Sequence, residues 1–191
     1  MSTQQNKWDN TYRNADYTRL EVSAVLKRNQ HLLPSSGHAV DLACGLGANA
    51  ICLAASGLVT EAWDFSSVAL AQLEHYARTH QLDITTQQRD IEQHPPSVNQ
   101  FDVVIVTHFL YRPIFPAVLA SLKPGGLLYY QTFTRSKTSH DGPSNPNYLL
   151  AENELLNLCA GLKVLYYREE GQQGNWQAGW RNQAMIVAKK P

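Results

Sequence analysis

Residues Val40–Ala50 read Val-Asp-Leu-Ala-Cys-Gly-Leu-Gly-Ala-Asn-Ala. The apolar residues at the start predict a buried strand over Ala39–Ala43, and the alanine-rich end predicts a helix over Ala48–Ala55. Between them, Gly45 and Gly47 let the backbone turn tightly and approach a ligand without an intervening side chain. Ligands of α/β sheets bind at such turns, at the carboxyl end of a strand beside the point where the strand order reverses. We therefore expect a ligand site at this turn.

Alternating strand and helix patterns extend from this turn in both directions. The clearest buried strand is Phe101–Thr107. Such alternation predicts an α/β fold, doubly wound, with a mostly parallel seven-stranded sheet and helices on both faces. Two strand patterns at the end of the chain, with no helix between them, predict an antiparallel C-terminal hairpin. The expected strands are 39–43, 58–63, 82–88, 101–107, 127–133, 162–167 and 183–188, and the expected helices are 17–33, 48–55, 66–80, 114–122 and 151–159.

Size and composition narrow the class of protein. With 191 residues the chain suits one domain, 1–191, in which 1–36 forms an N-terminal helical cap segment. The formal net charge is zero, so nothing marks a nucleic acid or an anionic membrane as a partner. No apolar run is long enough to span a bilayer, and the polar N-terminus lacks a signal core, which predicts a cytoplasmic protein. The cysteines, Cys44, Cys52 and Cys159, have spacings that suggest neither a disulfide framework nor a zinc site, and we expect no metal.

Two classes of ligand fit the glycine turn. The spacing Gly45-x-Gly47-x-x-Ala50 also satisfies the dinucleotide fingerprint, and Asp64 lies near the position of its ribose-binding acid. A carboxylate at Asp41, however, would repel a diphosphate, whereas it suits a ligand that bears an ammonium and a sulfonium. The sequence therefore favours S-adenosylmethionine, with an NAD-dependent dehydrogenase as the rival interpretation.

Five segments in register resemble the landmarks of class I S-adenosylmethionine-dependent methyltransferases. They span most of residues 40–133 in the family's order, and the β-β ending also fits. The resemblance is greatest to the small bacterial branch that contains tellurite-resistance-type and thiopurine-type methyltransferases, and it implies a Rossmann-like methyltransferase fold. The segments are Asp41–Gly47, Trp63–Ser66, Arg89–Ile91, Phe101–Val104 and Lys123–Gly126.

The resemblance implies that S-adenosylmethionine is the cofactor and that the turn faces its methionine part. Gly45 and Gly47 would pack against that part, together with Cys44. Asp41 would act through the ammonium or through the structure of the turn. Thr107, at the end of the fourth strand of the family's order, belongs to the same binding set.

The resemblance also assigns an adenosine subsite. Asp64 would accept hydrogen bonds from both ribose hydroxyls, and Asp90 would accept one from the adenine amino group. Ile91 would offer its backbone N–H to a ring nitrogen, and Phe65 and Ile91 would flank the adenine ring. The alternatives are a helix-entry role for Asp64 and a solvated loop position for Asp90.

Catalysis by methyl transfer needs alignment, exclusion of water and, for some acceptors, a base. His108 is the candidate base, because histidine titrates near neutrality. Tyr111 and Arg112 are candidates for orienting the acceptor or the carboxylate of the cofactor. A structural histidine and a solvated face are the alternatives. Many amino-group methyltransferases carry Asn/Asp-Pro-Pro-Tyr/Phe here, whereas residues 107–113 read Thr-His-Phe-Leu-Tyr-Arg-Pro, which argues against methylation of nucleic-acid bases.

Two segments could cover the site. Trp8, Tyr12, Arg13 and Tyr17 form an aromatic and basic cluster near the N-terminus, and residues 134–148 form a long polar loop that is a candidate lid. The sequence therefore predicts an enzyme that methylates an unidentified small molecule. A non-catalytic sensor or adaptor that binds S-adenosylmethionine is the alternative, and the oligomeric state stays open.

Overall fold

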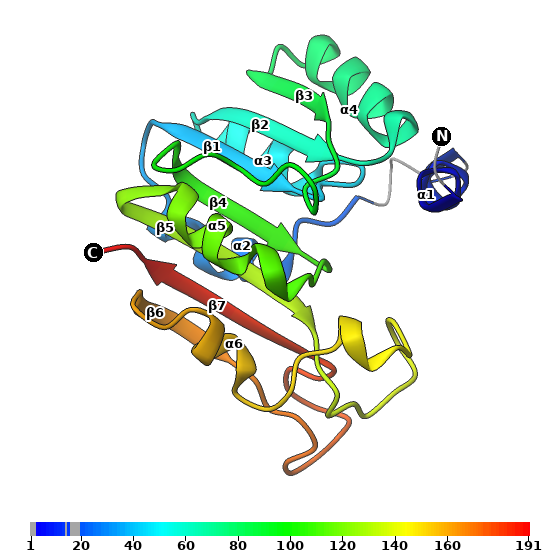
Figure 1. The fold of residues 1–191 in the computed structure, drawn as a ribbon, viewed down its shortest axis with the longest axis vertical. Coiled ribbons are helices and arrows are strands. Elements are labelled where there is room, and N and C mark those ends of the chain that lie inside the picture. The colour runs from blue at the N-terminus through cyan, green and yellow to red at the C-terminus, as the bar shows by residue number, and fades with distance from the viewer. Residues whose placement is uncertain (1–2, 14, 16–19) are drawn as a thin grey trace.

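A single seven-stranded sheet organises the molecule, with strand order β3-β2-β1-β4-β5-β7-β6 (Figure 1). The computed structural model describes residues 3–13, 15 and 20–191. Strands β1 to β5 pair in parallel, and β7 is antiparallel to both β5 and β6. This confirms the predicted doubly wound sheet and its C-terminal hairpin. The strands are β1 (His38–Leu42), β2 (Val59–Asp64), β3 (Ile84–Gln88), β4 (Phe101–Thr107), β5 (Leu122–Phe133), β6 (Lys163–Arg168) and β7 (Gln183–Lys189).

Helices cover both faces of the sheet, because successive side chains of a strand point to opposite faces. On β4, Val104 and Val106 belong to the apolar cluster under α5 and α6, while Val103 and Ile105 belong to the cluster under α2 and α3. The helices are α1 (Thr3–Arg13), α2 (Ala24–Asn29), α3 (Ala48–Ala55), α4 (Ser67–Thr79), α5 (Phe115–Ser121) and α6 (Glu154–Leu158), with short 3₁₀ turns η2 (Gln30–Leu32), η3 (Arg112–Ile114) and η4 (Pro146–Tyr148).

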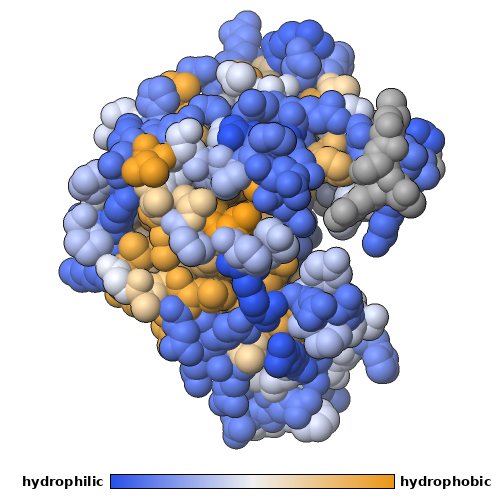
Figure 2. All heavy atoms as spheres, in the orientation of Figure 1, coloured by the Kyte–Doolittle hydropathy of each residue, from blue (hydrophilic) through white to orange (hydrophobic). Residues whose placement is uncertain are grey.

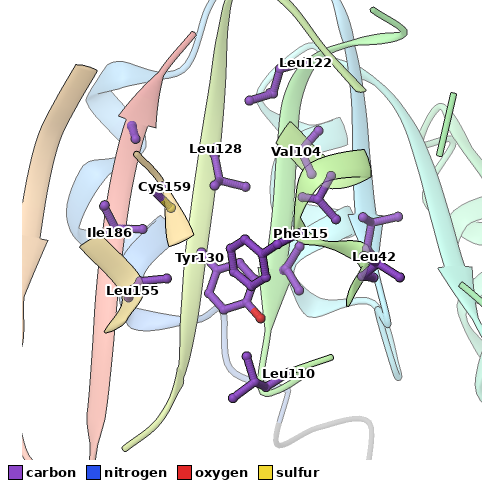
Figure 3. Packing of buried hydrophobic residues seen from close by; sticks show 14 of the residues in the cluster. Leu42, Val104, Leu110, Phe115, Leu122, Leu128, Tyr130, Leu155, Cys159 and Ile186 are labelled. Atoms are coloured by element: carbon purple, nitrogen blue, oxygen red, sulfur yellow. The ribbon is translucent and has the colours of Figure 1, made fainter. Parts of the chain in front are cut away.

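The cluster under α5 and α6 forms the larger part of the core. Phe115 of α5 lies against Tyr130 of β5, with ring centroids 4.9 Å apart, and Leu155 of α6 approaches the same face (Figure 3). Apolar side chains also reach the surface on this side of the molecule (Figure 2). The burial on both faces explains why β4 reads as an unbroken apolar run.

Most predicted elements are present within a few residues of their expected ends, but the helix expected over 17–33 is wrong. Residues 16–19 lie outside the described part of the chain, residues 20–23 are not helical, and α2 begins only at Ala24. Its start is set by two distant side chains: the N–H groups of Ser23 and Val25 donate to Asn49 Oδ1 and Gln131 Oε1. Apolar periodicity alone carries no sign of these contacts.

A second difference concerns β5, which begins five residues before the predicted Leu127. Phe101 pairs with Leu122 and Val103 with Leu127, so the Lys-Pro-Gly-Gly segment lies inside the strand as an irregularity. The helix expected over 151–159 is also shorter, because α6 is a single turn from Glu154 to Leu158.

Candidate active site

A pocket of about 390 Å³ opens at the carboxyl ends of β1, β2 and β4. The strand order reverses between β1 and β4, and α1 lies beyond the carboxyl ends of these strands (Figure 1). Trp8 and Tyr12 of α1 are among the residues that line the pocket. Its volume falls within the range of about 300–1,000 Å³ that is usual for small-molecule sites. The described residues that line it are Trp8, Tyr12, Leu20, Glu21, Ser23, Ala43, Cys44, Gly45, Leu46, Gly47, Ala48, Asn49, Asp64, Phe65, Arg89, Asp90, Ile91, Glu92, Thr107, His108 and Phe109.

The glycine turn forms the floor of this pocket and is held by Asp64. The Asp64 carboxylate accepts the Gly45 N–H at 2.8 Å on one oxygen and the Ser66 N–H at 2.8 Å on the other. Burial raises the pKa of Asp64, and these hydrogen bonds oppose the rise. Gly47 adopts a φ of +79°, and a Cβ there would lie 2.4 Å from Leu73 Cδ2. The turn therefore requires glycine for its own conformation and packing.

Asp41 lies fully buried below the turn, and it is not among the residues that line the pocket. One of its oxygens accepts the Ala50 N–H of α3 at 3.1 Å, and the other has no hydrogen-bond partner among the described residues. Burial raises its pKa to about 8, although the Ala50 N–H opposes the rise. Two roles are expected for Asp41, contact with the ammonium of the cofactor and support of the glycine turn. The hydrogen bond to Ala50, just after the turn, is consistent with the second role.

Helix α1 forms one wall of the pocket. Tyr12 lies over Gly45, where an added Cβ would come within 2.8 Å of the Tyr12 hydroxyl, and Trp8 stacks on Tyr12. Burial, and next the charge of Asp64, raises the pKa of Tyr12. The helix is attached through Asp9, which is buried and accepts the Ser66 hydroxyl at 2.6 Å.

The predicted aromatic cluster is thus present in part. Trp8 and Tyr12 line the pocket, whereas Arg13 contacts Asn10 on the exposed side of α1. Tyr17 lies outside the described residues.

The predicted adenosine residues gather at the ends of β2 and β3. Phe65, Asp90 and Ile91 all line the pocket beside Asp64. Ile91 is buried, and Asp90 accepts the Glu92 N–H at 3.0 Å with one oxygen. The structure therefore brings together all the residues expected to hold the adenosine.

Arg89 frames the same end of the pocket. Its guanidinium lies 4.0 Å from the centroid of the Trp63 ring and donates to the carbonyls of His94 and Pro95 at 2.6 and 2.8 Å. Among the described lining residues, Arg89 is the single lysine or arginine, whereas four residues carry carboxylates. The lining is therefore suited to a positively charged ligand. The four acids are Glu21, Asp64, Asp90 and Glu92.

The opposite end of the pocket lies at the end of β4. Thr107 and His108 both line it. The His108 ring lies 5.2 Å from that of Phe133, and desolvation lowers the pKa of its imidazole, although a side-chain hydrogen bond with Gln183 opposes this. A lowered pKa keeps the imidazole neutral, the form that can accept a proton.

Sequence reasoning missed Ser23 and Asn49 at this end. The Asn49 side chain joins Ser23, whose N–H it accepts at 3.0 Å, to Thr107, whose hydroxyl accepts its N–H at 3.1 Å. No local pattern signals this, because the partners are 26 and 58 residues apart.

Two other candidates lie away from the pocket. Tyr111 packs against the core cluster under α5 and α6 and does not line the pocket. Arg112 holds Glu154 at 2.5 and 2.9 Å and also donates to the carbonyls of Asn147 and Leu149. Arg112 thus ties the long loop to α6, and it is not among the residues that line the pocket.

The candidate lid, residues 134–148, contacts the C-terminal hairpin instead of the pocket. Thr138 donates its N–H to Asn182 at 2.7 Å, and Gln172 donates to the carbonyl of Lys137 at 2.6 Å. None of its residues is among those that line the pocket.

The cysteines are free thiols. Cys44 lines the pocket, but burial, and next the charge of Asp41, raises its pKa, so its sulfur is held as a thiol. In the described ranges, no cluster of three or more His, Cys, Asp or Glu could hold a metal ion. No described helix is both long and apolar enough to cross a bilayer.

Solved structures with this fold are numerous. TehB from Haemophilus influenzae aligns with a TM-score of 0.76 and 20% identity over 92% of this chain and 64% of its own, so the present chain spans less than two thirds of TehB. A SAM-dependent methyltransferase from Aquifex aeolicus aligns over 100% of both chains, with a TM-score of 0.70 and 15% identity. The [4+2]-cyclase SpnF aligns with a TM-score of 0.68 and 20% identity over 87% of this chain and 78% of its own. At these identities the likeness establishes the fold.

The sequence also matches a family model over part of its length. Residues 39–126, from β1 to the irregularity in β5, match the family described as "Methyltransferase domain", while no curated protein matches the chain. The matched segment contains the glycine turn, Asp64, Asp90 and Thr107. Residues 39–126 are thus similar to a methyltransferase domain, and the fold of the chain is shared with solved S-adenosylmethionine-dependent methyltransferases.

Proposed function

We propose that this enzyme transfers the methyl group of S-adenosylmethionine to a small-molecule acceptor bound in the pocket beside α1. The pocket itself carries the proposal: its volume of about 390 Å³ suits a nucleoside ligand, and its lining combines a glycine turn with four carboxylates. We also propose that residues 1–191 form one domain in the cytoplasm, with no nucleic-acid or membrane partner.

The fit of the cofactor rests on the chemistry of the lining. Asp64 and Asp90 offer carboxylate acceptors for ribose hydroxyls and an adenine amino group, and Phe65 and Ile91 offer apolar surface for a flat ring. Both Asp64 oxygens already accept a backbone N–H, but each retains a further lone pair for a ribose hydroxyl. The acidic balance of the lining suits a sulfonium and an ammonium.

The cofactor supplies an electrophilic methyl group, which leaves the protein the tasks of alignment, desolvation and, where needed, removal of a proton. Trp8 and Tyr12 of α1 shield one side of the pocket from water. His108, the histidine of the lining, can accept a proton from an acceptor, since its lowered pKa keeps it neutral at pH 7. Tyr111, being packed against the core, is proposed to support the β4 end and not to touch the acceptor.

The decisive experiment measures binding of S-adenosylhomocysteine by calorimetry. Asp90→Ala is the cleanest variant, because the Asp90 side chain makes one described hydrogen bond, to the Glu92 N–H, and its loss leaves the glycine turn intact. We expect at least tenfold weaker binding, equivalent to one lost hydrogen bond of about 1.4 kcal/mol or more. Asp83→Ala, at the opposite end of β3 and exposed, is the matched control and should bind normally. Equal affinity of all three proteins would contradict the adenosine subsite.

Labelled cofactor then separates an enzyme of this kind from a non-catalytic binder. The acceptor panel contains thiols, phenols, carboxylates, amines and chalcogen oxyanions. Transfer to one class identifies the acceptor atom, and His108→Gln tests the base on that substrate. Tight binding with no transfer to any class would favour the sensor or adaptor.

A further inference from the structure

One buried hydroxyl in the pocket has no partner. Ser23 is 8% exposed and lines the pocket, and its Oγ makes no hydrogen bond with any described residue. A buried hydroxyl without a partner is unfavourable, because it has given up its hydrogen bonds to water without replacing them. Such a group at a ligand site is therefore a candidate contact for the ligand.

The position of Ser23 in its own segment makes the unused hydroxyl more informative. Ser23 is the N-cap residue of α2, where a serine side chain normally accepts a backbone N–H of the first turn. Here no such bond forms, because the Val25 N–H donates to Gln131 Oε1 at 2.8 Å instead. Gln131 is itself fixed by Gln183 at 2.7 Å. Gln131 of β5 thus caps the first turn of α2, and the Ser23 hydroxyl remains available for a ligand.

A second hydroxyl at the same place has a proton to donate. Thr107 Oγ1 accepts from Asn49 Nδ2 at 3.1 Å, so its lone pair is engaged while its hydrogen is not. Asn49 also accepts the Ser23 N–H at 3.0 Å, and this holds the two hydroxyl-bearing residues at one end of the pocket. Asn49 is therefore a positioning residue for both.

The order of the strands indicates which part of the cofactor would lie beside Ser23 and Thr107. The pocket follows the ends of β3, β2, β1 and β4, adjacent strands being about 4.8 Å apart. Asp90 and Asp64 stand at the β3 and β2 ends, and Thr107 at the β4 end. If the adenosine occupies the acidic end, its amino-acid group extends across β1 toward β4.

We propose that Ser23, together with Thr107, donates a hydrogen bond to the carboxylate at the amino-acid end of S-adenosylmethionine. The inference rests on the proposed binding of that cofactor in this pocket. Glu21, two residues before Ser23 in the chain, also lines the pocket and adds a carboxylate that would favour the ammonium. The two hydroxyls thus discriminate the complete cofactor from shorter adenosyl thioethers.

The test compares three ligands by calorimetry: S-adenosylhomocysteine, its decarboxylated analogue, and 5′-methylthioadenosine, which lacks the whole amino-acid group. Ser23→Ala should weaken binding of S-adenosylhomocysteine about tenfold, the scale of one charge-assisted hydrogen bond, and change the other two less than twofold. Ser121→Ala is the control: Ser121 is also buried, but its hydroxyl donates to the Val118 carbonyl at 2.7 Å, away from the pocket. It should bind all three ligands normally.

Ligand-free stability supplies a second readout. Removal of an unpartnered buried hydroxyl should leave the Tm of Ser23→Ala equal to or above that of the wild type, whereas Ser121→Ala should lower it. A clear fall in the Tm of Ser23→Ala overturns the inference, because the hydroxyl then has a partner in the free protein. Unchanged affinity for S-adenosylhomocysteine, or an equal loss for all three ligands, also overturns it. A wild type that binds none of the three overturns the cofactor site itself.

Discussion

Replacing Asp41 by asparagine should change how the stability of the protein depends on pH. Asp41 is fully buried, and burial raises its pKa from 3.8 to about 8. Between these values the unfolded chain has released the proton while the folded protein still holds it. Because the folded state then binds more protons, the free energy of unfolding falls as the pH rises. The stability that protonated Asp41 contributes is fully present below pH 3.8 and is lost progressively as the pH rises to about 8.

The magnitude follows from the same linkage. One proton contributes about 1.4 kcal/mol for each pH unit, so the Asp41 contribution between pH 5.5 and 7.5 is about 2.7 kcal/mol. Asparagine cannot titrate, and its side-chain oxygen can still accept the Ala50 N–H. Asp41→Asn should therefore lack this slope and be more stable than the wild type at pH 7.5, by a difference that grows with pH.

Urea unfolding at pH 5.5, 6.5 and 7.5, followed by circular dichroism, measures both curves. Asp102→Asn is the matched control, because Asp102 pairs with Lys123 at 2.7 Å and its pKa is lowered by the hydrogen bonds of His38 and Lys123. The Asp102 carboxyl is ionised in both the folded and the unfolded protein between pH 5.5 and 7.5. Asp102→Asn should therefore shift the free energy of unfolding without changing its slope against pH. Parallel curves for the wild type and Asp41→Asn would refute the argument.

Three further perturbations test the site. Gly47→Ala should lower the free energy of unfolding by several kcal/mol and abolish binding of S-adenosylhomocysteine, since the new Cβ meets buried Leu73 at 2.4 Å. The control is Gly161→Ala, at a position with φ +92° and open space around it. This variant should lose about 1–2 kcal/mol of stability in chemical denaturation and bind the ligand normally. Asp9→Ala should speed proteolysis within α1 and weaken ligand binding severalfold, because α1 loses its hydrogen bond with Ser66, the N-cap of α4. Equal cleavage of the wild type and Asp9→Ala would exclude this explanation. His108→Gln should reduce turnover on the order of 10²-fold and remove an acidic limb below pH 6.5 from the rate profile, a limb that must persist if another group is the base.

The parts of the fold that sequence predicts well are those specified by local chemistry. Helix α3 and strand β4 have the expected bounds, because an alanine-rich segment after a glycine turn and an unbroken apolar run each admit few alternatives. Of the two serines that could cap α4, Ser66 and Ser67, Ser66 does so, since its hydroxyl accepts the Ala69 N–H at 3.2 Å. The irregularity in β5 was not foreseen, because a Lys-Pro-Gly-Gly segment is compatible with both a turn and a bulge.

The candidate site divides in the same way. The glycine turn, Asp64 and Asp90 belong to contiguous motifs and gather as predicted. Ser23 and Asn49 were missed, because their roles depend on polar contacts between segments that are remote in the sequence. Tyr111 is only three residues from His108, but the backbone turns at His108, with φ +56°, and Tyr111 packs against the core.

The unpartnered polar atoms of the pocket region suggest how a ligand would stabilise the fold. Ser23 Oγ at one end of the pocket and an Asp41 oxygen below the turn are both buried without partners among the described residues. Each of these atoms lowers the stability of the ligand-free protein. Of these, the hydroxyl lines the pocket and could gain a partner from a ligand directly, whereas Asp41 is separated from the pocket by the turn and could gain only from a nearby positive charge. A sulfonium or ammonium above the turn would favour the ionised form of Asp41 and lower its pKa. Binding should therefore release a proton near pH 7, and calorimetry in buffers of different ionisation enthalpy would detect it in the wild type and not in Asp41→Asn.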